Sequence, residues 1–194
     1  MLIRSEWTAR TGGQLDEISS HYKANAHVVL PRFLTDSAHA LLRKETDRLI
    51  SSSVRKDFDM ACMDGSARRM RTLGAPVIDA LSTLVPELYY SPDMLALLGR
   101  IAGEQVYPLY EDVDRYVLNS LVRPGDTFGA HFDDYPLSLV VVVEVAEEGG
   151  RPRLLPGARR VLDVMDEHVE VTSPPATRTC CGRTPPRTTC LRSG

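Results

Sequence analysis

The sequence changes character near residue 105, and this change limits the folds open to the chain. Before it, apolar residues recur at helical spacing, most clearly over 35–51 and over 92–101, which starts with a proline and stops before Gly103. After it, short runs of β-branched and aromatic residues alternate with Gly/Pro turns. Helices followed by short strands predict an α+β domain with a jelly-roll-like β core.

Shorter elements follow from the same patterns. Residues 27–30 indicate a strand and about 76–84 a helix, whereas 1–25 and the basic stretch 52–73 have weak periodicity and are expected to be irregular. Further strands are predicted at 106–110, 115–122, 137–145, 153–155 and 169–171, with a helical patch before the last of them.

A chain of 194 residues predicts one domain over 1–174, with a helical support layer at 1–104, a β core at 105–174 and a disordered tail at 175–194. The net charge of −3 lacks the basic excess typical of proteins that bind nucleic acids. There is no signal-peptide pattern and no apolar run approaching about 18 residues. We therefore expect a cytoplasmic protein with no membrane segment.

The motif His131-Phe132-Asp133 carries the clearest chemistry. It lies between a Gly/Pro turn at 123–126 and a continuous apolar stretch at 137–143. A His and an Asp two residues apart at a strand end can reach one metal ion. With one distant His they form the facial triad of non-haem Fe(II) oxygenases. The alternative is a capped turn at a strand end, but the surrounding order of motifs favours the metal site.

Five segments, in this order, carry a family resemblance: Tyr116-Val117-Leu118-Asn119, Arg123-Pro124-Gly125-Asp126, His131-Phe132-Asp133-Asp134, Gly149-Gly150 and Pro156-Gly157. They resemble the Fe(II)/2-oxoglutarate-dependent dioxygenases, in particular the bacterial branch of free-amino-acid hydroxylases and halogenases, over roughly 100–160. The resemblance implies a double-stranded β-helix (cupin-like) core that holds Fe(II), with 2-oxoglutarate as cosubstrate and O₂ as oxidant. An Fe(IV)-oxo intermediate then hydroxylates a small substrate. Halogenating relatives replace the motif's carboxylate by Gly or Ala, so the retained Asp133 favours hydroxylation.

The same resemblance assigns roles around His131 and Asp133, the implied metal ligands and catalytic residues. Arg68 resembles the arginine that holds a substrate carboxylate, and Asn119 a residue that contacts 2-oxoglutarate. Asp114 and Asp134 resemble acidic residues that face the substrate's ammonium groups. The competing interpretations are a solvated surface arginine at 68 and an ordinary loop carboxylate at 114.

The family also needs a later His ligand and an Arg or Lys that anchors 2-oxoglutarate. After Asp133 the only histidine is His168, whose spacing and context do not suit a ligand. Read with GC-rich codons in a shifted frame, the tail from Pro175 yields G-D-A-Y-L-L-R-A-D-T-T-A-H-H-V-S-P, a strand with the required His. We therefore expect a frameshift near codon 175; the alternative is a genuine disordered Pro/Thr/Arg-rich tail.

A core that lacks closing strands exposes sheet edges, which predicts association, for example as a homodimer. Without the residue that anchors 2-oxoglutarate, we expect little turnover by this 194-residue chain. Two other functions stay open: a non-catalytic jelly-roll protein that binds a small molecule, and a cupin-type metalloenzyme that does not use 2-oxoglutarate.

Overall fold

The computed structural model describes residues 2–9, 12–61, 65–131 and 135–147, together with three short strands at 153–154, 160–164 and 170–171. His168, the motifs Gly149-Gly150 and Pro156-Gly157, and the tail at 175–194 lie outside the described residues. The structure therefore does not bear on the frameshift hypothesis.

The helices of the described chain are α1 (Ser5–Thr8), α2 (Gly12–Asn25), α3 (Asp36–Ile50), α4 (Ala75–Leu81), α5 (Leu84–Tyr89) and α6 (Pro92–Ala102). Thr35 caps α3 by accepting a hydrogen bond of 3.1 Å from the amide of Ala38. Gly103 ends α6 in the left-handed conformation, with φ +75°. The predicted helices at 35–51 and 92–101 are thus confirmed. The helix predicted at about 76–84 is confirmed as α4, which ends at Leu81, whereas α5 was not predicted. No helix among the described residues is long and apolar enough to cross a membrane.

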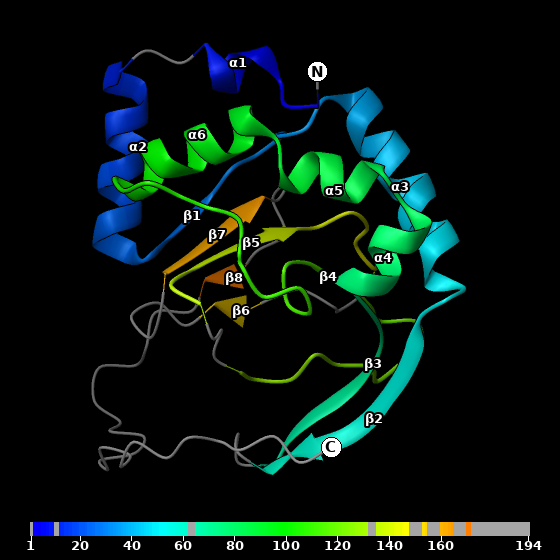
Figure 1. Ribbon diagram of the computed structural model, residues 1–194. Helices are drawn as coiled ribbons and strands as arrows, with labels where there is room; N and C mark the ends of the chain where they lie inside the picture. Colours follow the sequence, from blue (N-terminus) through cyan, green and yellow to red (C-terminus); the bar gives the residue numbers. More distant parts are fainter. Residues whose placement is uncertain are drawn as a thin grey trace, which may run out of the picture.

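The strands form three small sheets (Figure 1). Their bounds are β1 (His27–Val29), β2 (Val54–Met60), β3 (Ser66–Gly74), β4 (Val117–Ser120), β5 (Leu137–Val141), β6 (Arg153–Leu154), β7 (Arg160–Val164) and β8 (Glu170–Val171). One sheet is parallel with the order β1-β7-β5, one is antiparallel with the order β2-β3-β4, and β6 pairs with β8. The mixture of helices and sheets agrees with the α+β prediction, but the described strands do not make up a jelly roll.

Four local predictions were wrong. Residues 52–73 contain the hairpin β2–β3, which is rich in charged residues: Asp57 lies opposite Arg69 and their side chains form an ion pair at 2.7 Å. Residues 106–110 form no strand, and the Leu109 amide bonds instead to the Tyr89 hydroxyl at 2.7 Å. The expected helical patch before 169 contains strand β7.

The fourth error concerns the first 25 residues, where α1 and α2 replace the expected irregular segment. Helix α2 escaped prediction because it buries only Leu15, Ser19 and Tyr22, a narrow stripe on a polar helix.

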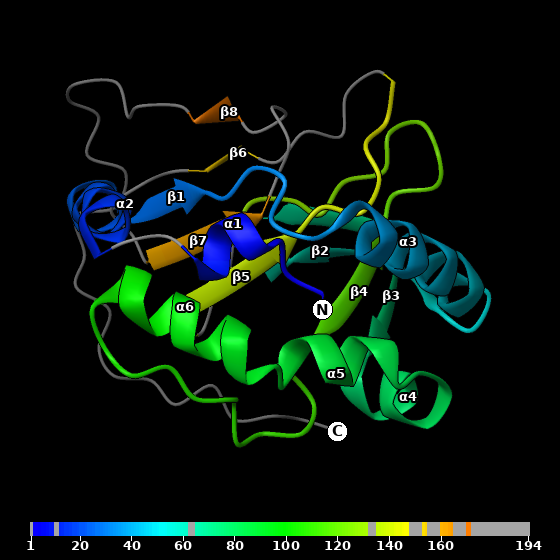
Figure 2. The same ribbon diagram turned by 90° about the horizontal axis from the view of Figure 1, so that it is seen from above.

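The main apolar core lies between the helices and one face of the parallel sheet. Trp7 and Phe33 lie with ring centroids 6.0 Å apart near its centre, and alternate residues of 137–143 pack against it. A smaller cluster of Leu49, Leu73 and Ile78 joins α3 and α4 to β3. Figures 1 and 2 show α1, α2 and α6 beside the parallel sheet and α3 and α4 beside the antiparallel one, with the β2–β3 hairpin extending away from the helices. The face of β3 opposite to Leu73 therefore points away from α3 and α4, and the candidate site lies on that face.

Replacing Thr35 by Ala should lower the free energy of unfolding by about 1 kcal/mol, because the amide of Ala38 loses its cap. Urea unfolding measures the change. Thr35→Ser keeps a hydroxyl at the cap and should stay close to wild type; equal losses in both variants would contradict the capping role.

Candidate functional site

Strand β3 presents two different faces because successive side chains alternate. Leu73 points into the small helix-covered cluster, so Arg68, Met70 and Thr72 point the other way. Asn119 on β4 lies opposite Thr72 in the register and so belongs to this second face. Arg68 is 6% exposed on this face, a degree of burial that is rare for an arginine.

The chain leaves β4 through a tight turn at Arg123–Asp126. The Asp126 amide donates to the Arg123 carbonyl at 3.0 Å, Pro124 occupies the second position and Gly125 has φ +84°. This combination is typical of a type II turn, whose third position requires a positive φ. The sequence signal at 123–126 thus marks a real turn.

Asp126 ties this turn to the hairpin. Its two carboxylate oxygens each accept a hydrogen bond of 2.7 Å from the guanidinium of Arg55 on β2. The amides of Val122 and Arg123 donate to the same carboxylate at 2.9 and 3.1 Å. The bond from Arg55 is the main cause that holds the pKa of the Asp126 carboxyl well below its usual range, against the opposing effect of burial.

After the turn the chain runs along β3. Thr127 exchanges two backbone hydrogen bonds of 2.9 Å with Arg69. Gly129 follows with φ +69°, so close to β3 that an added Cβ would overlap the Ala67 carbonyl oxygen and lie 2.5 Å from the Ser66 hydroxyl. Only glycine fits here.

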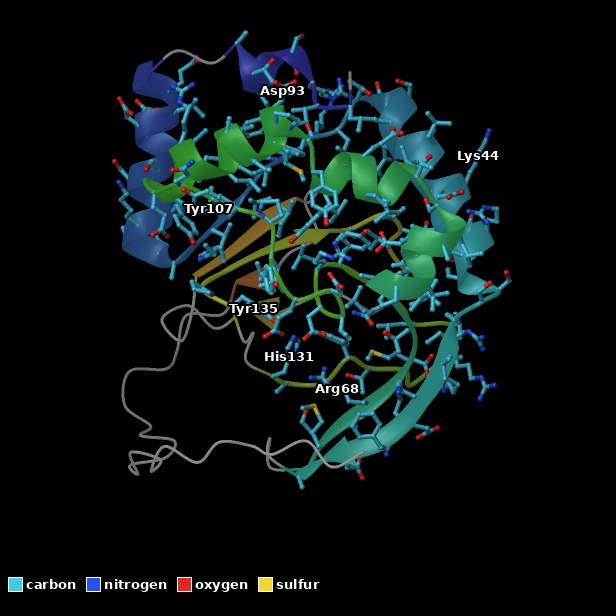
Figure 3. The ribbon with its side chains drawn as sticks, viewed as in Figure 1. Lys44, Arg68, Asp93, Tyr107, His131 and Tyr135 are labelled. Carbon is cyan, nitrogen blue, oxygen red and sulfur yellow. The ribbon has the colours of Figure 1, made fainter. Side chains whose placement is uncertain are left out.

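This path places Phe128 and His131 beside Arg68. The Arg68 guanidinium carbon lies 4.3 Å from the centre of the Phe128 ring, a cation–π contact. The His131 ring meets the same Phe128 ring edge-on, with centroids 4.4 Å apart. An Nη1 atom of Arg68 lies 3.5 Å from Nδ1 of His131, and Figure 3 shows the two side chains next to each other. Arg68 also donates from Nε to the Met60 sulfur at 2.8 Å.

The tautomer of His131 follows from its contacts. Nδ1 lies 3.0 Å from the Gly129 carbonyl oxygen, which can only accept a hydrogen bond. Nδ1 therefore carries the proton in the neutral ring, and the longer contact to Arg68 is not a second hydrogen bond. The lone pair then lies on Nε2, and a carbonyl on the other ring nitrogen is the usual support of a metal-binding histidine.

A second polar group surrounds Tyr135. Its hydroxyl donates to Glu111 at 3.1 Å and approaches Asp114 at 3.4 Å. Burial, followed by the hydrogen bond and charge of Glu111 and the charge of Asp114, raises the pKa of Tyr135 to about 12. Both carboxylates are otherwise exposed, so they can receive a cationic group.

The segment that bears these carboxylates is held at both ends. The Tyr89 hydroxyl accepts from the Leu109 amide at 2.7 Å, and at the other end Tyr116 donates to Asp79. Burial, then the hydrogen bond to Asp79, raises the pKa of Tyr116. The acidic residues at 111–114 are thus presented from an anchored segment.

The structure brings together two of the predicted residues, Arg68 and His131, and puts Asn119 on the same sheet face. Asp114 lies with Tyr135. Asp133 and Asp134 lie outside the described residues. Within the described part of the chain, no group of three or more His, Cys, Asp and Glu side chains is arranged to hold a metal ion.

Sequence reasoning missed several side chains of the site, namely Arg55, Met60, Glu111, Asp126, Phe128 and Tyr135. Two of them had a usable signal. Phe128 and Tyr135 flank the His131 motif and stand outside any periodic apolar run, which marks them as candidates for specific contacts. Arg55 had none, because its partner lies 71 residues away.

Geometry alone supports the description of a mixed α and β protein in which a buried arginine lies beside a histidine. Comparison with known families adds the identity of the class: the model of the family Halogenase D matches residues 11–170. The chain belongs to the Halogenase D family, which indicates an enzyme with oxidoreductase-type chemistry and agrees with the halogenase-like branch predicted from the motifs. No curated protein matches the chain.

Gly129→Ala should destabilise the protein by about 3 kcal/mol or more, since it adds a left-handed non-glycine residue and a clash with the backbone of β3. Chemical unfolding measures the loss. The matched control is Gly13→Ala in α2, which meets nothing within 4 Å and should gain roughly 0.5–1 kcal/mol. A neutral Gly129→Ala would mean that this segment does not lie against β3.

The Arg55–Asp126 pair should make stability depend on pH in the acid range. A carboxyl whose pKa is lowered by folding stabilises the native state above its unfolded pKa, and this contribution fades as pH falls toward the folded pKa. The difference in unfolding free energy between wild type and Asp126→Asn should therefore be full above about pH 5 and shrink toward pH 3. Urea unfolding across this range measures it; a constant difference would contradict an ionised Asp126.

Proposed function

We propose that this chain derives from an Fe(II)/2-oxoglutarate-dependent oxygenase that hydroxylates a small metabolite, a free amino acid or a derivative of one. The observation that carries the proposal is the buried guanidinium of Arg68, 3.5 Å from the ring of His131. A guanidinium at that place can pair bidentately with a carboxylate and hold it beside a metal ligand. Membership of the Halogenase D family supports the same chemistry.

The residues fit an iron site as far as the described chain allows. His131 has the tautomer that offers Nε2 to a metal, and its Nδ1–H is fixed by the Gly129 carbonyl. Asp133, two residues on, would supply the carboxylate ligand of a facial triad. Iron with bound 2-oxoglutarate and O₂ would supply the oxidising chemistry. The protein's part is to orient the substrate and to exclude water from it.

Hydroxylation is the proposed outcome although the family is named for halogenation. The carboxylate of Asp133 would take the metal position that halogenating relatives leave open for chloride, by the resemblance noted above. Replacing Asp133 by Gly would therefore affect whether the enzyme hydroxylates or halogenates its substrate.

Substrate contacts follow from charge. Arg68 would bind the carboxylate of an amino acid, and Asp114 and Asp134 would face its ammonium groups, with Tyr135 holding Asp114 in place. Asn119, exposed on the same sheet face as Arg68, would contact 2-oxoglutarate.

Metal titration of the full chain tests the proposal. Wild type should bind Mn(II) in the micromolar range under anaerobic conditions, and His131→Ala and Asp133→Ala should lose this binding. His39→Ala, an exposed histidine on α3, is the matched control and should bind as wild type does. Because only His168 follows Asp133, we expect weak binding and little conversion of 2-oxoglutarate to succinate by this chain.

Three results would contradict the proposal. Metal binding that ignores 2-oxoglutarate would favour a cupin-type metalloenzyme. Amino-acid binding without any metal would favour a non-catalytic binding protein. Metal binding that survives both His131→Ala and Asp133→Ala would move the site elsewhere.

A further inference from the structure

Asp126 is a buried carboxylate that the proposed metal and substrate contacts do not use. Its side chain is 2% exposed, although residues 121–125 before it lie at the surface. Removing a carboxylate from water is unfavourable unless hydrogen bonds replace its hydration. Asp126 has such bonds from Arg55 and from two backbone amides. The hydrogen bonds of this carboxylate therefore fix the conformation of the turn that carries it.

The partner of Asp126 belongs to the hairpin that carries Arg68. Arg55 lies on β2 opposite Arg71 of β3, and Phe58 further along β2 lies opposite Arg68. The planar guanidinium of Arg55 grips both carboxylate oxygens at 2.7 Å, which fixes direction as well as distance. The ion pair therefore joins the hairpin bearing the anion-binding group to the segment bearing the proposed metal ligand.

The segment between Asp126 and His131 transmits this restraint. Thr127 is hydrogen-bonded to Arg69 in both directions, and Gly129 rests against the backbone of β3. Phe128 contacts both Arg68 and His131, and the Gly129 carbonyl accepts from the imidazole. The orientation of the His131 ring follows from where the backbone is held at residues 126–129.

We propose that Arg55 and Asp126 are positioning residues, which hold the His131 imidazole and the Arg68 guanidinium at the separation that metal and substrate binding require. Loss of this one ion pair loosens the metal site and the anion site together. The proposal rests on the proposed function only in taking His131 as a metal ligand; the restraint on residues 127–131 is independent of it.

An exposed ion pair elsewhere in the molecule serves as a control. Arg43 and Glu144 also bridge distant segments, at 2.8 Å, but their side chains are 56% and 58% exposed. An exposed pair of this kind contributes little to stability. Glu144→Gln therefore repeats the chemical change of Asp126→Asn without its burial.

The experiment compares full-length wild type with Asp126→Asn, Arg55→Lys, Glu144→Gln and Thr35→Ala, the last as a destabilised variant remote from the site. Two quantities are measured: the Kd for Mn(II) by calorimetry, and amide hydrogen exchange at Thr127 and Gly129, neither of which bonds to Asp126. Asp126→Asn should weaken Mn(II) binding about 10- to 100-fold, the usual effect of removing a group that supports a metal ligand. It should also speed hydrogen exchange at both amides. Arg55→Lys, which keeps the charge but cannot donate two parallel hydrogen bonds, should show smaller changes of both kinds.

Glu144→Gln and Thr35→Ala should leave both quantities at the wild-type level. The proposal is wrong if Asp126→Asn and Arg55→Lys leave either quantity unchanged, or if Thr35→Ala weakens Mn(II) binding equally, because the effect would then be one of general stability. If wild type binds no Mn(II), the proposed function fails, and the exchange rates alone decide the positioning role. Should Asp126→Asn not fold, Arg55→Lys supplies both readouts.

Discussion

The pairing of β3 on both of its edges is the interaction on which the candidate site depends. Strand β2 covers one edge, while β4 and then Thr127 share the other. Each of these hydrogen bonds holds β3 in place and gives its backbone groups the partner that they need when they are buried. This arrangement turns Arg68 away from the helices and returns the chain to it at His131, after a detour through the turn at 123–126. Without the pairing on this second edge, the buried Arg68 would have neither Phe128 nor His131 beside it.

Much of the helical part could be predicted because its signals are local. A capping threonine, an N-terminal proline and a glycine after the last turn each act within a few residues: α3 begins after such a threonine, and α6 begins with such a proline and ends before such a glycine. The hairpin β2–β3 could not be read in this way. Its strands are rich in charged residues, among them Asp57 and Asp59 paired with Arg69, so no apolar period marks them.

The site divides along the same line. The motif around His131 was visible in the sequence because its residues are adjacent, and the turn before it was marked by Pro124 and Gly125. The burial of Arg68 was not visible, since a basic run is more typical of a solvated surface. Burial here comes from Phe128 and Met60, which reach Arg68 from other segments. Contacts across such separations are set by tertiary structure, so sequence could name the arginine only through a family resemblance.

The order of strands in the parallel sheet has a consequence for how the chain is made. Strand β7, at residues 160–164, lies between β1 and β5, which therefore have no direct pairing with each other. A growing chain can complete the β2-β3-β4 sheet and the segment through His131 well before β7 emerges. Until then, β1 and β5 present unpaired edges, and such edges are sites of association for incomplete chains. The antiparallel sheet thus has a head start in folding, while the parallel sheet must wait for a contact of high sequence separation.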